Sequence, residues 1–281
     1  MQKNSNKHVI TGRTRIFGII ADPILQVKTP EEMNALMAAC GEDRVLIPMH
    51  VTEAQLENAV GGFRSIQNLD GFIVTVPHKT AIVALCDSLS PAAQMVGAVN
   101  VVRRDADGHL HGDILDGVGF VAGLRSSGIE PRGMSVYLCG AGGAAQAISF
   151  ALGEAGVSHI TIANRTHAKA EELINRLAAE FPQLSLAIGS PDPSGHELVV
   201  NATSMGLRDS DDYPCDVSLL GADQVVAEII MQPERTRLLE AASAKGCRIH
   251  LGRPMLRCQI KLMAEAMGVE SQRPLQTGGG E

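Results

Sequence analysis

Two ionisable side chains stand where a protein built of strands and helices can carry out acid–base chemistry. Lys79 follows Pro77, directly after the apolar run at residues 71–76, and Asp116 stands where a predicted strand passes into a predicted helix. A lysine and an aspartate that face one cleft can move a proton to or from a substrate hydroxyl. Taken singly, each also has a structural interpretation, because surface lysines and helix-capping aspartates are common.

A glycine-rich turn offers a second kind of chemistry. The apolar run at residues 136–139 leads into it, and an alanine-rich helix is predicted to follow to about residue 155. In such a strand-turn-helix unit the first glycine permits a tight turn, the second lets the backbone approach a pyrophosphate, and the helix N-terminus supplies N–H groups. The spacing alone is a weak signal, and its position between strand and helix strengthens it. The predicted phosphate cradle consists of Gly140, Ala141, Gly142, Gly143 and Ala144.

The end of the next predicted strand, at residues 159–163, indicates which dinucleotide binds. An Asp or Glu at this place would grip the ribose 2′-hydroxyl of NAD, but the chain carries Asn164, Arg165 and Thr166 there. Arg165 suits a 2′-phosphate, so the predicted cofactor is NADP. A nicotinamide would then move the hydride while Lys79 and Asp116 handle the proton.

Composition argues against several other functions. The chain has 281 residues, a formal net charge of −7 and no Trp, and it shows no basic stripe interleaved with aromatics, so a nucleic-acid partner is not expected. No apolar run is long enough to span a bilayer and residues 1–13 are polar, which predicts a cytoplasmic protein without a membrane partner. The cysteines form no Cys-x-x-Cys pair and the histidines no metal-ligand spacing, so we expect reduced thiols and no metal.

Alternating strand and helix signals predict an α/β chain, and its length suggests about two domains. The first is expected to hold a mixed, mostly parallel sheet with one hairpin around the turn at residues 105–108, and the second a doubly wound Rossmann-type sheet. Capping boxes at Thr29–Glu32 and Thr52–Gln55 predict two helix starts, and a further helix is expected at residues 80–87. The tail at residues 271–281 is expected to be disordered.

Seven motifs together resemble the shikimate and quinate dehydrogenase family, in matching order and spacing over nearly the full chain. They are Val74-Thr75-Val76-Pro77-His78-Lys79, Gly97-Ala98-Val99-Asn100, Asp116-Gly117-Val118-Gly119-Phe120, Gly140-Ala141-Gly142-Gly143-Ala144, Asn164-Arg165-Thr166, Asn201-Ala202-Thr203-Ser204-Met205-Gly206 and Met255-Leu256-x-x-Gln259.

The resemblance implies a substrate domain at residues 1–116 with 253–281, where the C-terminal helices return, and a Rossmann NADP domain at residues 117–252. It implies hinge closure over a cleft and Lys79 with Asp116 as the catalytic pair. It further implies that Thr75, Asn100 and Gln259 hold ring hydroxyls of the substrate, and that Thr203 and Met205 border the cofactor.

Several positions that face the substrate in relatives depart from the family pattern. The usual Ser-x-Ser-Pro run is Val27-Lys28-Thr29-Pro30 here, and apolar side chains stand at Ile73, Leu115 and Met231. A lost hydrogen bond to a substrate hydroxyl or charge costs about 1–3 kcal/mol. Two or three losses would weaken shikimate binding by roughly two to four powers of ten. We therefore expect the carboxylate end of the pocket to be less polar than in relatives.

Two residues of this run keep alternative interpretations. Thr29 either contacts substrate or caps a helix, and Lys28 either replaces part of the carboxylate grip or is a solvated loop lysine.

The predicted function is reversible hydride transfer between NADP(H) and a cyclic hydroxyl or ketone. The substrate is either the family's shikimate and 3-dehydroshikimate, of aromatic amino acid biosynthesis, or a less polar relative. The alternatives are a dehydrogenase for quinate or another catabolic ring hydroxyl, against which Arg165 argues, and a non-catalytic NADP-binding regulator, against which Lys79 and Asp116 argue. A monomer or homodimer is expected.

Overall fold

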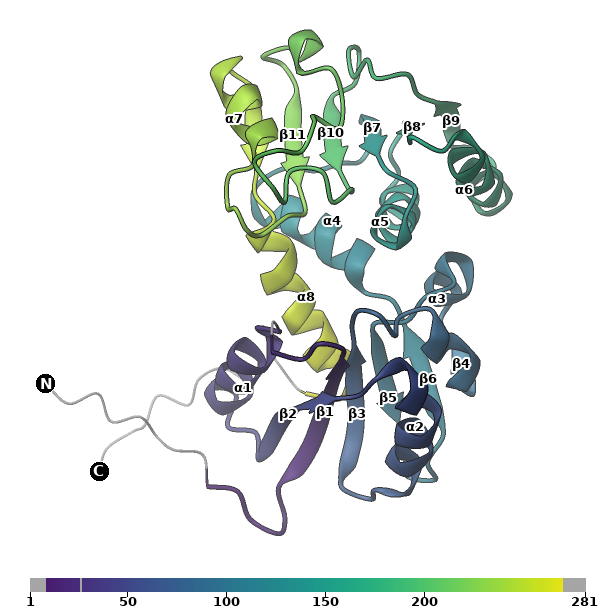
Figure 1. The fold of residues 1–281 in the computed structure, drawn as a ribbon, viewed down its shortest axis with the longest axis vertical. Helices are drawn as coiled ribbons and strands as arrows, with labels where there is room; N and C mark the ends of the chain where they lie inside the picture. The colour runs from purple at the N-terminus through teal and green to yellow at the C-terminus, as the bar shows by residue number, and fades with distance from the viewer. Residues whose placement is uncertain (1–8, 26, 270–281) are drawn as a thin grey trace, which may run out of the picture. The chain divides into compact units, whose positions relative to one another are not determined.

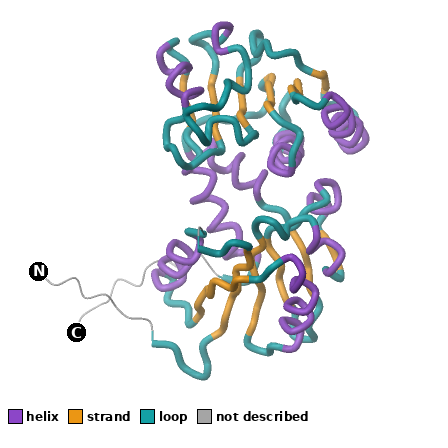
Figure 2. Tube along the Cα trace, viewed as in Figure 1, coloured by secondary structure: helices purple, strands orange, loops and turns teal. Residues whose placement is uncertain are grey.

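The chain divides into two compact units in this computed structural model. One consists of Met1–Ile114 with Ile260–Glu281, and the other of Leu115–Gln259. The structure describes residues 9–25 and 27–269, so the predicted disordered tail lies outside the described residues. The prediction of an α/β fold with two sheets is confirmed (Figures 1 and 2).

The first unit is built on a mixed six-stranded sheet with the order β2-β1-β3-β5-β6-β4. Five of its strands run in one direction and β5 runs in the other, so β5 and β6 form the predicted antiparallel hairpin. The inner strand β1 has a neighbour on each side and is buried along most of its length, as parallel strands covered by helices usually are. The strands are β1 (Arg15–Ala21), β2 (Arg44–His50), β3 (Leu69–Val74), β4 (Ser88–Leu89), β5 (Val101–Arg104) and β6 (Leu110–Asp113).

The helices of the first unit begin differently from the prediction. Helix α1 (Thr29–Ala39) has Lys28 at its N-cap and no side-chain cap, so the predicted capping box is wrong. Pro30 fits either of the first two helical positions, and its presence therefore left the start open by one residue. Helix α2 (Leu56–Ser65) begins after a 3₁₀ turn at Glu53–Gln55 and also lacks a side-chain cap. The structure also describes a short helix α3 (Pro91–Val96) in this unit.

The helix predicted at residues 80–87 is instead the short 3₁₀ turn Ala81–Leu85. The chain has only a few residues here before β4 begins at Ser88, and such short pieces favour 3₁₀ over α-helical hydrogen bonding. This prediction was therefore wrong in type.

The second unit is a six-stranded parallel sheet with the order β12-β11-β10-β7-β8-β9. The chain proceeds outward from β7 in one direction and then returns to β10 on its other side. The switch point therefore lies where the carboxyl ends of β7 and β10 adjoin, which is where such sheets bind ligands. The strands are β7 (Ser135–Cys139), β8 (His159–Ala163), β9 (Ser185–Ile188), β10 (Leu198–Asn201), β11 (Val225–Glu228) and β12 (Arg248–His250).

Helices connect these strands as Figure 2 shows. They are α4 (Asp116–Ser126), α5 (Gly143–Glu154), α6 (His167–Glu180) and α7 (Arg237–Ala244), and α8 (Arg253–Ala266) follows β12. No helix of the described residues is long and apolar enough to cross a membrane. All six cysteines are free thiols.

Helix α4 approaches two other helices through glycines. A Cβ built on Gly117 would lie 1.9 Å from the carbonyl oxygen of Ala147 in α5. A Cβ on Gly123 would lie 2.8 Å from the backbone nitrogen of Met255 at the start of α8. Backbone therefore meets backbone on two sides of α4, and any side chain at these positions would separate the helices.

Replacing Gly117 tests this contact. Gly117→Ala forces the Ala147 carbonyl away and is expected to destabilise the protein by about 3 kcal/mol. Gly61→Ala is the matched control, because Gly61 is exposed in α2 with nothing within 4 Å of a built Cβ. It should stabilise the protein by about 0.5–1 kcal/mol. Urea unfolding measures both, and equal midpoints for the two variants would contradict the packing described.

Candidate active site

The predicted phosphate cradle lies at the switch point of the second unit. Gly140 has φ +109°, and a Cβ there would lie 3.0 Å from Thr203 Cγ2, so glycine is required. Its N–H donates to the Ala163 carbonyl at 2.8 Å. Gly142, the N-cap of α5, and Gly143 have nothing within 4 Å of a built Cβ. The backbone at the N-terminus of α5 is thus open to a phosphate group.

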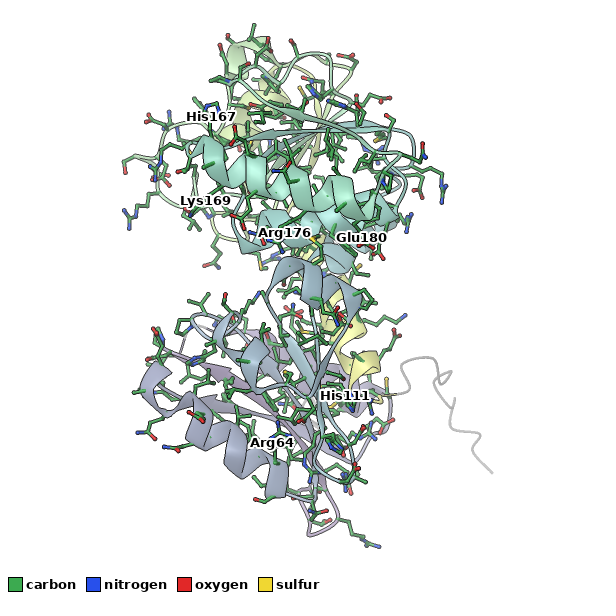
Figure 3. All side chains as sticks on the ribbon, turned by 90° about the vertical axis from the view of Figure 1, so that its right-hand side faces the viewer. Arg64, His111, His167, Lys169, Arg176 and Glu180 are labelled. Carbon is green, nitrogen blue, oxygen red and sulfur yellow. The ribbon has the colours of Figure 1, made fainter. Side chains whose placement is uncertain are left out.

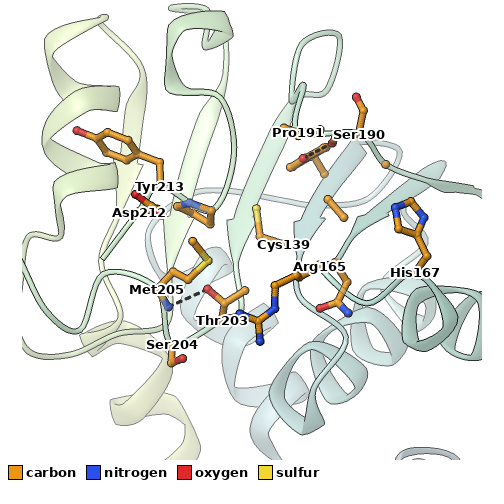
Figure 4. A pocket seen from close by; sticks show the side chains of 15 residues that line it. Cys139, Arg165, His167, Ser190, Pro191, Thr203, Ser204, Met205, Asp212 and Tyr213 are labelled. Atoms are coloured by element: carbon orange, nitrogen blue, oxygen red, sulfur yellow. Dashed lines mark hydrogen bonds between the residues drawn. The ribbon is translucent and has the colours of Figure 1, made fainter. Parts of the chain in front are cut away.

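A pocket of about 830 Å³ lies at the carboxyl ends of β7, β8 and β10. Its lining includes Asn164, Arg165, Thr203 and Met205, four of the predicted cofactor residues. The sequence interpretation missed several others, because no motif marks them: His167, Ser190, Pro191, Asp212 and Tyr213. Figure 4 shows Arg165 and His167 at one side of this pocket and Asp212 and Tyr213 at the other.

Cationic side chains gather beside the pocket. Arg165 is exposed, and the Asn164 amide donates to the Thr166 carbonyl at 2.8 Å, which holds the turn before α6. Figure 3 shows His167 and Lys169 in the first turn of α6. No carboxylate stands at residues 164–166 to compete for these donors. Glycine cradle, helix N-terminus and exposed guanidinium together fit a dinucleotide that carries an extra phosphate.

Asp116 is the first residue of α4, and its carboxylate accepts a hydrogen bond from a side chain far along the chain. Gln259 Nε2 in α8 donates a hydrogen bond to Asp116 Oδ1. Both side chains are 7% exposed. A Cβ built on Gly119 would lie 3.0 Å from Gln259 Cβ, so this glycine lets the amide reach the carboxylate. The predicted helix-capping role of Asp116 is not observed, since Leu115 is the N-cap.

In the first unit, backbone hydrogen bonds gather three predicted site residues at the carboxyl end of β3. The Thr75 N–H donates to the Ile20 carbonyl at 3.2 Å, and the Val99 N–H donates to the Lys79 carbonyl at 2.8 Å. The Asn100 carbonyl accepts from the Val74 N–H at 2.9 Å, and its side chain is buried. Thr75, Lys79 and Asn100 therefore share one edge of the sheet.

The residues at which this chain departs from its family pattern differ in exposure. Ile73 is 3% exposed within β3 and Leu115 is also buried. Val27, Thr29 and Met231 are partly exposed, whereas Lys28 is exposed. Lys79 belongs to the first unit and Asp116 to the second, so their pairing stays a prediction.

Two further observations concern ionisable side chains. Within residues 9–25 and 27–269, no three or more His, Cys, Asp or Glu side chains group as a metal site would. His250, at the end of β12, is 2% exposed and meets the Phe120 ring of α4 edge-on at 6.3 Å between centroids. Burial, together with the nearby Arg248, lowers the pKa of His250 to about 4. The imidazole is therefore neutral at pH 7.

Two family models match this chain. One, described as the shikimate dehydrogenase substrate binding domain, matches residues 19–102, and one described as shikimate / quinate 5-dehydrogenase matches residues 126–203. A shikimate dehydrogenase (NADP(+)) of Rubrobacter xylanophilus is 38% identical, over 94% of this chain and 91% of its own.

Two solved structures are similar over nearly the whole chain. Shikimate 5-dehydrogenase of Listeria monocytogenes, in complex with shikimate and NAD, has a TM-score of 0.86 and 32% identity and covers 95% of each chain. The ligand-free 5-ketofructose reductase of a Gluconobacter species has a TM-score of 0.84 and 32% identity, over 92% of this chain and 94% of its own.

The low pKa of His250 predicts acid sensitivity. Because the imidazole has a pKa of about 4 when folded and about 6.5 when unfolded, the unfolded state binds more protons between these values. Stability is full above about pH 6.5 and falls as pH drops toward 4, by on the order of 2 kcal/mol. We expect the melting temperature to change less steeply with pH across this range in His250→Leu than in the wild type. Parallel slopes for variant and wild type would contradict the assignment.

Proposed function

Because the chain belongs to the shikimate and quinate dehydrogenase family, we propose that it transfers a hydride reversibly between NADP(H) and a cyclic hydroxyl or ketone. The family predicted from seven motifs is thus confirmed, and with it an NADP-dependent oxidoreductase. The observation that carries the choice of cofactor is the exposed Arg165 beside an open glycine cradle, with no acid at residues 164–166.

In this proposal the cofactor, when bound, accepts or returns the hydride. The Lys79 amine moves the proton of the reacting hydroxyl, and the Asp116 carboxylate supports that transfer. Thr75, Asn100 and Gln259 orient ring hydroxyls. The hydrogen bond from Gln259 to Asp116 supports these roles, because it fixes the orientation of the carboxylate.

The cofactor contacts are proposed for the cradle and the pocket edge. Backbone N–H groups from Gly140 to Ala144 would hold the pyrophosphate, and Asn164, Arg165 and Thr166 the 2′-phosphate. Thr203 and Met205 would border the rest of the cofactor. The support is that Asn164, Arg165, Thr203 and Met205 line one cavity, and that Gly142 and Gly143 lie at an open helix N-terminus.

Substrate choice has two candidates. The sequence similarity to the Rubrobacter enzyme favours shikimate and 3-dehydroshikimate. The partly exposed apolar Val27 favours a less polar compound, and the 5-ketofructose reductase shows by its name that a similar fold acts on a keto sugar, which has no carboxylate. Ile73, Leu115 and Met231 are the other apolar residues at positions where the family resemblance leads us to expect polar ones.

We also propose a cytoplasmic enzyme that is a monomer or a homodimer. Free thiols in all six cysteines support this compartment. Quinate oxidation and a non-catalytic regulatory role are the alternatives that the activity measurements below distinguish.

Activity against a panel tests the reaction class. NADP⁺ reduction at 340 nm would be followed with shikimate, quinate and neutral polyols, and Lys79→Met should lower kcat by roughly 10²- to 10⁴-fold. Lys261→Met, which removes an exposed lysine of α8, is the matched control. Full activity of Lys79→Met would overturn the catalytic role. Turnover of shikimate at least as efficient as that of every neutral compound would reject the less polar substrate.

Removal of Arg165 tests the cofactor. Arg165→Ala should weaken NADP⁺ binding roughly 10- to 100-fold, the usual loss for a charge-assisted contact, and leave NAD⁺ binding nearly unchanged. Arg235→Ala, which breaks only an exposed pair with Glu240, is the control. Calorimetric titration measures both. An equal loss for the two dinucleotides would exclude a 2′-phosphate contact.

A further inference from the structure

A buried carboxylate lies at the end of β11, outside the proposed chemistry. Glu228 is 0% exposed and accepts four hydrogen bonds. Its Oε1 accepts from the N–H groups of Ile229 and Ile230 at 2.9 and 3.1 Å. Its Oε2 accepts from Asn201 Nδ2 at 2.9 Å and from Thr236 Oγ1 at 3.0 Å. Such a set of donors suits an ionised carboxylate, which only accepts.

The contact with Asn201 fixes which way its amide points. An ionised carboxylate only accepts hydrogen bonds, and the NH₂ group is the only donor of the Asn201 amide. Asn201 Nδ2 must therefore face Glu228 and Oδ1 must face the other way. Oδ1 then accepts from the N–H and hydroxyl of Thr203 at 3.1 and 2.7 Å. Asn201 Nδ2 also donates to the Met205 carbonyl at 2.9 Å.

These contacts end at the pocket. Thr203 and Met205 line it, and Figure 4 shows the hydrogen bond of 3.0 Å from the Met205 N–H to Thr203 Oγ1. Thr203 also packs against Gly140, the first glycine of the cradle. Burial raises the pKa of Glu228, and the hydrogen bonds from Asn201, Ile230, Thr236 and Ile229 oppose that effect.

We propose that Glu228 is a positioning residue for the cofactor pocket, acting through Asn201 on the turn that carries Thr203 and Met205. The proposal rests on the proposed function in taking NADP as the ligand. None of the four residues that donate to Glu228 lines the pocket. The role of Glu228 is to fix the orientation of the Asn201 amide. The shape of the pocket wall beside the glycine cradle depends on that orientation.

Glu228→Gln tests the role without changing side-chain size. If Oε1 of the glutamine keeps the backbone N–H groups, its Nε2 faces Asn201 Nδ2, and two donors oppose each other. The Asn201 amide must then turn and release Thr203. Calorimetry without substrate should show NADP⁺ and NAD⁺ binding both weakened roughly tenfold, since a lost contact of this kind has that effect. Glu228→Asp keeps an acceptor and should lose less, within about threefold.

Thr236→Val is the matched structural control. It removes one donor to the same carboxylate but leaves Asn201 in place, so thermal stability should fall while the dissociation constant for NADP⁺ stays within about twofold. If Glu228→Gln does not fold, the test uses Glu228→Asp, Thr203→Val and the double variant, which alter the two ends of the hydrogen-bond series through Asn201. Their effects on NADP⁺ binding should then be less than additive.

Three outcomes decide between the proposals. Wild-type affinity in Glu228→Gln, additive effects of Glu228→Asp and Thr203→Val, or a Thr236→Val variant that binds as poorly as Glu228→Gln would each overturn the positioning role. Wild-type protein that binds neither dinucleotide would instead overturn the proposed function.

Discussion

The close contact of α4 with α5 and α8 is the constraint on which the second unit depends. Gly117 packs against the Ala147 carbonyl of α5, and Gly119 and Gly123 pack against the backbone of α8. Only bare backbone leaves room for this approach, and the approach brings the Gln259 amide to the Asp116 carboxylate. A packing requirement and the orientation of a proposed catalytic group thus have one origin. The glycines of the Asp116 motif are therefore explained by helix packing before any chemistry is invoked.

At the cofactor pocket, buried polar side chains hold the residues that form the pocket wall. Gly140 turns beneath Thr203, and the Asn201 amide holds Thr203 on one side and Met205 on the other. Glu228 ends this series as a buried acceptor with four donors. A buried carboxylate is costly unless its hydrogen bonds are made, and full satisfaction is what makes such a network rigid.

Much of this arrangement could be predicted from local patterns, and the rest depends on distant segments. The strand-turn-helix at Gly140 has its own signature, and alternating apolar runs revealed both sheets. The start of α1 was misplaced because Pro30 fits two positions. The bond from Gln259 to Asp116 spans 143 residues, and the wall at Asp212 and Tyr213 comes from an irregular loop. Tertiary packing decides these features, and no local pattern records them.

The two ends of the proposed reaction differ in what they demand of a ligand. At the cofactor end, a cationic edge and open backbone N–H groups attract negative charge. These groups replace the hydrogen bonds that a phosphate gives up when it leaves water. At the substrate end, Asn100 is proposed to hold a ring hydroxyl, while Val27 stands where the family resemblance leads us to expect a serine. In this proposal, a carboxylate beside Val27 would lose bound water and gain no hydrogen bond from that side chain, whereas an uncharged group would lose less. Selection between the two substrate candidates therefore rests on desolvation at that one end.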